Sequence, residues 1–422
     1  MTVKRFACGD VIPGCALVVT GACDQSVLDQ VLAHAAAEHG MVNPPLSLLE
    51  LVMAHTHPLC PDRGRGHLRL VDPHPGQHDP VGETAPADGR GGPTGGPAHA
   101  DPVPAAVRRI RAHESYRHEC VLYGGLDDFL TTMVPFIRDG LAREEPVMVA
   151  VAQPRLRALR SALGPDADTV RFADMADLGA NPARIIPAWR DFTQRYSGPG
   201  RPVRGIGEPI WAGRRPVDIV ESQLHEALLN TAVAPDTPLW LLCPYDTTTL
   251  GKEVLAEAHR SHPVIVRGND YRGSTSYGGT VHIDTLFHRP LPDPAGPVTG
   301  IVFDRDRHRH IEQLIRHART AGLPPADAVK LAVAVHEIAA AAYHDTGDVR
   351  IRLWTDRAAL LCEITDPGRI TDPMIGRTGS STGTARDRAA GLANQLCELV
   401  QIRSAPDGTI TRLHTRQGAT SC

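Results

Sequence analysis

The sequence predicts a multidomain protein of mixed α/β and α+β class, with a small metal module ahead of two larger domains. The chain has 422 residues, and at about 150 residues per domain this length is enough for two to three domains. Strand and helix patterns alternate along the middle of the chain, which predicts a parallel sheet covered by helices. Towards the end, two helical patterns precede a β-hairpin, which predicts an α/β sandwich.

Composition and charge exclude several classes of protein. The chain is 42% hydrophobic and 22% charged, which is typical of a globular protein, and its 44 Lys and Arg against 48 Asp and Glu provide no basic field for direct nucleic-acid binding. There is no apolar run of about 18 residues to span a membrane and no signal-peptide pattern at the start. We therefore expect a cytoplasmic chain with no membrane partner, in which the nine cysteines are thiols or metal ligands.

Two segments rich in glycine and proline predict the domain boundaries. From Pro61 to Pro104, 18 of 44 residues are Gly or Pro, and such a segment buries too little apolar surface to offset its ordering entropy. Four prolines in Arg289–Pro297 disfavour a helix there. The predicted division is a module at 1–58, a flexible linker at 59–112, an α/β domain at 113–290 and a sandwich domain at 298–416.

The middle domain is predicted to be a series of strands and helices. After a first apolar run, Leu126, Phe129, Met133 and Ile137 recur at helical spacing, and the same pair of patterns then repeats. Predicted strands lie at 119–123, 146–152, 169–172, 203–206 and 239–243, with helices at 126–141, 154–163, 183–196 and 217–229.

The last domain has a different order of elements. Val349–Trp354 alternates with period two, and Leu360–Thr365 answers it, which predicts a β-hairpin. Around this hairpin we expect helices at 306–322, 325–344 and 386–397, a loop rich in Gly, Thr and Ser at 376–383, and a closing pair of strands around Asp407 and Gly408.

The N-terminal module contains candidate metal ligands. Cys8 and Cys15 flank a segment with Gly and Pro, and His34 and His39 follow on a helical stretch at 27–38. Two thiols and two imidazoles are the donor set of a tetrahedral zinc site. A module of about 55 residues has a small core and needs additional stabilisation, which a bound metal ion would supply. Cys23 is a substitute ligand, and the alternative is a pair of buried thiols with two hydrogen-bonded histidines.

The segments Phe6–Cys15 and Glu38–Met41 resemble a small bacterial domain of unknown function that is suspected of binding zinc. The resemblance covers about residues 3–43 and brings no known activity.

Polar residues follow the predicted strands of the middle domain. Ligands of parallel sheets bind outside the carboxyl ends of the strands, where these residues are expected to lie. Glu221 and His225 are four residues apart on one predicted helix face. The alternative for each residue is capping or solvation of an ordinary sheet. The candidate ligand-binding residues are His118, Glu208, Trp211, Glu221, His225, Tyr245 and Asp246.

The stretches that carry these residues resemble the MEDS sensory domain, named for methanogen and dichloromethane-regulator sensors, over about His113 to Val266. The resemblance implies a RecA-like parallel α/β fold that senses a small molecule. The segment lacks a phosphate loop, because the Gly-Lys at 251–252 is followed by Glu253 and has no glycine at the required earlier position. We expect no nucleotide hydrolysis in this domain.

The order of elements over Phe303–His414 resembles the GHKL ATP-binding fold, and most closely the anti-sigma-factor serine kinases. The resemblance implies that Glu337 is the catalytic base and that an Asn four residues later holds Mg²⁺. That position is Ala341, whose methyl group cannot coordinate a cation that needs oxygen ligands. Asp366 and Gly368 match the family's adenine-reading Asp-x-Gly, although Asp-Pro-Gly also forms a plain turn.

The phosphate turn of that family is also altered. Its two expected glycines fall on Asp387 and Ala389, and an acidic side chain there repels a phosphate. We therefore expect a degenerate domain that keeps the fold, binds ATP and Mg²⁺ weakly or not at all, and has no kinase turnover.

Together these features predict a cytoplasmic regulator of signal transduction and transcription. A small molecule would bind the middle domain and alter the contacts of the last domain with a partner, for which the resemblance implies a sigma factor or an anti-sigma antagonist; a homodimer stays open. One alternative is an active serine/threonine kinase of the anti-sigma-factor type. The other is an enzyme that uses the crevice of His118, Glu208, His225 and Asp246 on a small substrate.

Overall fold

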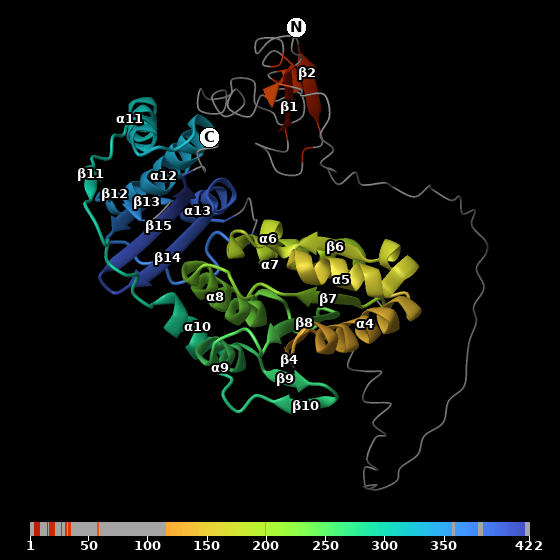
Figure 1. Ribbon diagram of the computed structural model, residues 1–422. Helices are drawn as coiled ribbons and strands as arrows, with labels where there is room; N and C mark the ends of the chain where they lie inside the picture. The colour runs from red at the N-terminus through yellow and green to blue at the C-terminus, as the bar shows by residue number, and fades with distance from the viewer. Residues whose placement is uncertain are drawn as a thin grey trace, which may run out of the picture.

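The structure is a computed structural model (Figure 1). It describes residues 4–8, 15, 17–21, 27, 30–31, 33–34, 57–58, 115–198, 200–356, 359–378 and 383–417. The predicted linker at 59–112 lies outside the described residues, as do His39, Cys23 and most of the predicted helix at 27–38. Among the described helices, none is both long and apolar enough to cross a membrane.

The N-terminal module contains a small antiparallel sheet. Its strands are β1 (Lys4–Ala7), β2 (Val18–Gly21) and β3 (His57–Pro58), in the order β2-β1-β3. Phe6 of β1 and Val19 of β2 pack with Val27 and Val31 in a small apolar core. This core brings the start of the module against residues of the segment predicted to be helical.

The middle domain is built on a seven-stranded sheet in the order β10-β9-β4-β8-β7-β5-β6. Every pairing is parallel except that of β9 with β10, so the predicted parallel α/β fold is confirmed. The strands are β4 (Arg117–Tyr123), β5 (Val147–Val151), β6 (Arg171–Asp174), β7 (Val203–Gly207), β8 (Leu239–Asp246), β9 (Val264–Arg267) and β10 (Asp270–Gly273).

Helices cover both faces of this sheet. Phe129 of α4 and Leu159 of α5 lie in one apolar core, whereas Trp189 of α7 and Leu228 of α8 lie in the other. The helices of the domain are α4 (Leu126–Ala142), α5 (Gln153–Leu163), α6 (Met175–Leu178), α7 (Ile185–Tyr196), α8 (Pro216–Ala232), α9 (Lys252–Ser261) and α10 (Gly279–Phe287), with short 3-10 helices at Gly164–Thr169 and Pro182–Arg184.

The last domain is an antiparallel sheet in the order β11-β12-β13-β15-β14, with helices packed on it. The predicted α/β sandwich is confirmed, and β11 is an additional edge strand of three residues. The elements are β11 (Thr299–Ile301), α11 (Arg307–Thr320), α12 (Pro325–Thr346), β12 (Arg350–Asp356), β13 (Ala359–Asp366), α13 (Ala385–Leu396), β14 (Leu399–Ala405) and β15 (Gly408–Arg416).

The middle and last domains share one apolar core. Helices α8 and α10 lie beside β14 (Figure 1), and Leu224 of α8 and Phe287 of α10 belong to the same buried cluster as Val400 and Ile402 of β14. The proline-rich segment Arg289–Pro297 is neither helix nor strand and joins α10 to β11. The two domains therefore meet through buried side chains as well as through the chain itself.

Candidate functional site

A cavity of about 660 Å³ opens in the last domain between the end of α12, the segment after β13 and the start of α13. Asp345 and Thr346 line it from α12, Gly368 and Ile370 from the segment after β13, and Arg386 from α13. This is the place where the resemblance puts a nucleotide.

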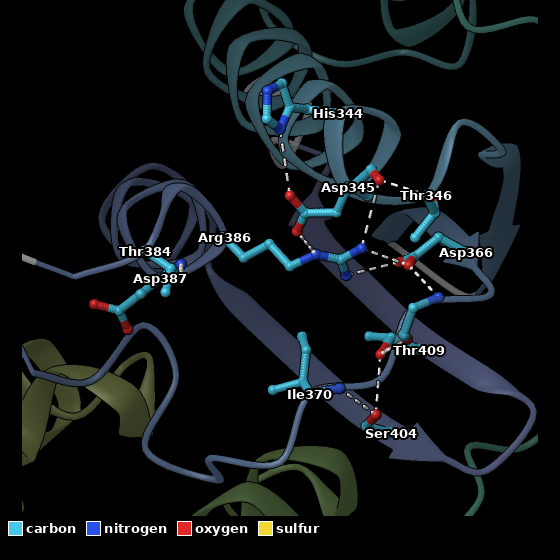
Figure 2. A network of polar contacts seen from close by, with 12 residues as sticks. His344, Asp345, Thr346, Asp366, Ile370, Thr384, Arg386, Asp387, Ser404 and Thr409 are labelled. Atoms are coloured by element: carbon cyan, nitrogen blue, oxygen red, sulfur yellow. Dashed lines mark hydrogen bonds and ion pairs between the residues drawn. The ribbon is translucent and has the colours of Figure 1, made fainter.

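The carboxylate of Asp366 is engaged by Arg386 (Figure 2). Asp366 is the last residue of β13, and its Oδ1 and Oδ2 accept from Nη2 and Nη1 of Arg386 at 2.6 and 3.1 Å. Arg386 also donates from Nε to Asp345 at 2.7 Å, a hydrogen bond that lowers the pKa of Asp345. A two-pronged, charge-assisted contact of this kind is among the stronger polar contacts in proteins.

Gly368 follows Asp366 in a tight turn. Its N–H donates to Oδ1 of Asp366 at 2.8 Å, and its carbonyl accepts from Thr409 at 2.7 Å. A Cβ at this position would lie 2.6 Å from the guanidinium of Arg386 and 2.8 Å from Thr346. Asp366 and Gly368 thus lie together, and the neighbour they contact is a side chain of the same domain, Arg386.

The N-terminus of α13 contains a carboxylate of the chain itself. Asp387 accepts from the backbone N–H of Gly376 at 2.7 Å and from the hydroxyl of Thr378 at 3.2 Å. Thr384 caps the helix by accepting from the N–H of Asp387. A helix N-terminus favours negative charge, and Asp387 supplies that charge at the position where the resemblance puts a phosphate.

Glu337 lies apart from this cavity. It is on α12 eight residues before Asp345, a rise of about 12 Å along the helix, and its carboxylate pairs with Arg307 of α11 at 2.8 Å. Ala341 is buried on the same helix. A smaller adjoining cavity is lined by Ile338 and Ala342 of α12 and by Asp366, Arg386 and Ala389, among others.

The seven residues predicted to bind a ligand in the middle domain fall into separate places. Glu208 and Asp246 lie together at the carboxyl ends of β7 and β8, where Arg155 of α5 pairs with each of them at 3.2 Å. The hydroxyl of Tyr123, at the end of β4, donates to Glu208 at 3.1 Å. Burial raises the pKa of Glu208 to about 7. Sequence reasoning missed Arg155 and Tyr123, although both follow the same rule that functional groups gather at the carboxyl ends of strands.

His118 and Tyr245 lie deeper in the domain. His118 of β4 contacts Glu226 of α8 at 3.1 Å and Cys243 of β8 at 3.3 Å. The ring of Tyr245 packs edge to face against His262. All five side chains are buried.

Glu221 faces the last domain. Its carboxylate accepts from Arg403 and from Gln401 (3.0 Å), both of β14, and lies 3.6 Å from Arg377. Burial alone would raise the pKa of Glu221, but the charge of Arg403 keeps it below its ordinary value. This predicted ligand residue therefore joins two domains.

The last two predicted residues are Trp211 and His225. Trp211 is half-buried, with the guanidinium of Arg214 above its ring. His225 is buried on α8, and burial lowers its pKa to about 3, so it is neutral at ordinary pH.

In the N-terminal module the structure brings three predicted metal ligands together. Sγ of Cys15 lies 3.1 Å from Nε2 of His34, and the ligand atoms of Cys8, Cys15 and His34 all lie within 4.8 Å of one another. The fourth predicted ligand, His39, lies outside the described residues. The cluster has the chemistry of a metal site.

Models of known protein families match three segments of the chain. Residues 117–263 match MEDS, the methanogen/methylotroph, DcmR sensory domain, and residues 306–415 match the histidine kinase-like ATPase domain. Residues 3–56 match a protein of unknown function, DUF1059. A search of curated proteins finds no match.

A sensory domain joined to a kinase-like ATPase domain defines a signalling regulator. This chain carries a MEDS domain and a histidine kinase-like ATPase domain behind an N-terminal DUF1059 segment.

Proposed function

We propose that the MEDS domain senses a small molecule and that the ATPase-like domain passes the signal to a protein partner without turning over ATP. The observation that carries this proposal is the ion pair between Arg386 and Asp366. The resemblance to anti-sigma-factor kinases implies that the carboxylate of Asp366 accepts a hydrogen bond from adenine. Here both of its oxygens accept from Arg386.

The rest of the pocket supports the same conclusion. An ATP phosphate at the start of α13 would meet the carboxylate of Asp387, which already accepts from Gly376 and Thr378. Ala341 provides no oxygen for Mg²⁺, and uncompensated phosphate charge beside a carboxylate is repulsive. Arg386 thus opposes the adenine contact, Asp387 the phosphate contact and Ala341 the metal contact.

Sensing is assigned to the carboxyl edge of the MEDS sheet. Glu208, Asp246 and Arg155 form a compact charged group there, with Glu208 buried and close to its titration point at neutral pH. Such groups hold polar small molecules in parallel α/β folds. The alternative function, an enzyme that acts on a small substrate, would use the same edge. Two of its predicted crevice residues, His118 and His225, do not lie with Glu208 and Asp246 but are buried elsewhere in the domain.

Helix α8 connects this edge to the ATPase-like domain. Glu208 follows β7, and the short segment after it leads into α8 at Pro216. The same helix carries Glu221, whose carboxylate is paired with Arg403 of β14. A change at Glu208 that shifts α8 must therefore change a buried contact of the ATPase-like domain.

The output is a protein contact. The resemblance to anti-sigma-factor kinases favours a sigma factor or its antagonist as the partner. For the N-terminal module we propose a zinc ion held by Cys8, Cys15 and His34 together with His39, because thiolates and imidazoles are its preferred ligands.

The sensing step is tested by screening small organic acids, alcohols and amines for an increase in the melting temperature of the full chain. For a compound that binds, amide hydrogen exchange is then measured with and without it. Exchange is expected to change at the end of β7, along α8 and in β14. Glu208→Gln should abolish the response, whereas the exposed Glu253→Gln on α9 should leave it intact. A response confined to segments outside the MEDS domain would contradict the proposal.

A further inference from the structure

Four metal-binding side chains converge inside the MEDS domain from four different elements. They are His118 of β4, Glu226 of α8, Cys243 of β8 and His262 directly after α9. All four are almost completely buried, and one ligand atom from each lies within 4.8 Å of the other three. The parallel pairing of β4 with β8, with Cys120 opposite Cys243, places His118 beside this thiol.

The spacing of the ligand atoms is close to that of a tetrahedral site. Nε2 of His118 lies 3.1 Å from Oε2 of Glu226 and 3.3 Å from Sγ of Cys243, and Nε2 of His262 lies 2.8 Å from the same Oε2. With bonds of about 2.0–2.3 Å, the ligands of a tetrahedral zinc ion are about 3.3–3.7 Å apart. An outward shift of a few tenths of an ångström therefore makes room for the ion.

The other nitrogen of each ring is held by an oxygen. Nδ1 of His262 lies 2.9 Å from the carbonyl of Ala258, and Nδ1 of His118 lies 3.1 Å from Oδ1 of Asn230. The amide nitrogen of Asn230 donates to the carbonyl of Ser261, which fixes the oxygen of Asn230 towards the histidine. Both rings are thus set to carry their proton on Nδ1 and to present the bare Nε2 to the cluster, as metal-binding histidines do.

Without a cation this arrangement leaves polar atoms unsatisfied. Two bare nitrogens face the carboxylate of Glu226, and lone pairs in such positions repel it. Oε1 of Glu226 is buried without a hydrogen-bond partner, and Nε2 of His262 is buried 2.8 Å from Oε2 without the geometry of a hydrogen bond. A buried polar atom without a partner costs about 1–3 kcal/mol, more when it is charged, and a divalent ion among these atoms would satisfy them.

We propose that His118, Glu226, Cys243 and His262 bind a divalent transition metal, with zinc the ion that best suits two imidazoles, a thiolate and a carboxylate. Four protein ligands leave no open position, which is typical of a structural site. The ion would fasten β4, β8 and α8 to the end of α9. This site is distinct from the N-terminal cluster of Cys8, Cys15 and His34 and shares no residue with it.

The test uses the full chain with Cys8→Ser and Cys15→Ser, so that the N-terminal cluster does not contribute. This background protein should contain about one zinc ion per chain by elemental analysis. After exchange for Co²⁺ it should show the visible absorption of tetrahedral cobalt together with a thiolate-to-cobalt charge-transfer band. Adding Cys243→Ser should remove that band, and adding Glu226→Gln should lower metal affinity. Cys362→Ser, at another buried cysteine on β13, is the matched control and should keep both metal and spectrum.

A background protein that contains no zinc and takes up no Co²⁺ would overturn the proposal and leave a cluster of protonated histidines around Glu226. Metal retained with an unchanged spectrum in the Cys243→Ser protein would also overturn it. Should that variant fail to fold, the spectrum of the background protein decides alone, because a cobalt complex without a thiolate band cannot involve Cys243.

Discussion

Glu221 of the MEDS domain and Arg403 of the ATPase-like domain form an ion pair that is almost completely shielded from water. Gln401 donates a second hydrogen bond to the same carboxylate, and Arg377 lies close by. A buried charge that loses its partner is strongly destabilising, so neither domain can move far from the other without a cost in free energy. This contact therefore holds the two domains together.

Replacing Glu221 should weaken the attachment between the two domains. Glu221→Gln leaves Arg403 and Arg377 buried without a carboxylate, and we expect a loss of about 3–5 kcal/mol in the free energy of unfolding. Urea unfolding followed by tryptophan fluorescence and circular dichroism measures this loss. The exposed Glu312→Gln on α11 is the control and should change little. An unchanged transition in Glu221→Gln would show that the domains are held together by their apolar contacts alone.

The buried carboxyl of Glu208 should make stability depend on pH. Its pKa is raised from 4.5 to about 7, so the folded chain binds this proton more tightly than the unfolded chain does. The resulting stabilisation is complete below about pH 4.5 and is lost as the pH rises through about 7. Its full size is about 3 kcal/mol.

The measurement is the free energy of unfolding of wild type and Glu208→Gln at intervals from pH 5 to about 8, the range in which the group titrates. The difference between the two proteins removes the contribution of the histidines common to both. We expect wild type to lose stability with rising pH relative to the variant. Parallel curves would mean that Glu208 is ionised throughout.

The N-terminal cluster should bind metal independently of the MEDS domain. Cys8→Ser should lower the zinc content by about one ion per chain and destabilise the small sheet, because metal binding contributes to the folding of such modules. Elemental analysis and limited proteolysis report these two effects. Cys397→Ser, a buried cysteine of the ATPase-like domain, should leave the zinc content unchanged. Equal zinc in the Cys8→Ser and wild-type proteins would rule out this site.

Removal of Arg386 should expose the carboxylate of Asp366. Arg386→Ala deletes two charge-assisted contacts to Asp366 and one to Asp345, and we expect a loss of about 1.5–3 kcal/mol in stability. Adenosine, which has no phosphates to meet Asp387, should then bind more tightly than it does to wild type. The exposed Arg316→Ala on α11 is the control for loss of a positive charge. Adenosine affinities that are equal in Arg386→Ala and wild type would show that Arg386 does not block the pocket.

The periodic elements of both large domains could be predicted from the sequence. In the parallel sheet, β5 is a continuous apolar run and β8 is almost entirely apolar, and the hairpin of β12 and β13 alternates with period two. The hairpin of β9 and β10 was missed because all four residues of β10 are exposed and carry no apolar pattern. The edge strand β11 was missed because three residues are too few for a pattern.

The sites were less predictable, since they depend on which side chains meet across the fold. Glu208 and Asp246 come together because parallel strands end at one edge, which the sequence does reveal. His262 lies beyond the end of α9 and reaches Glu226 only through the packing of α9 on α8, for which no motif exists. Arg386 crosses from α13 to Asp366, and its long side chain makes that partner impossible to read from spacing.

The most direct test of the account is a calorimetric titration of the full chain with ATP at millimolar Mg²⁺. The wild-type protein should bind ATP weakly or not at all, since Arg386 engages Asp366 and the carboxylate of Asp387 lies where the resemblance puts a phosphate. The combined variant Ala341→Asn, Asp387→Gly, Ala389→Gly and Arg386→Ala restores an oxygen ligand for Mg²⁺ and frees the pocket, and it should bind ATP measurably more tightly. Tight, magnesium-dependent binding of ATP by the wild-type protein would contradict the account and favour an active kinase.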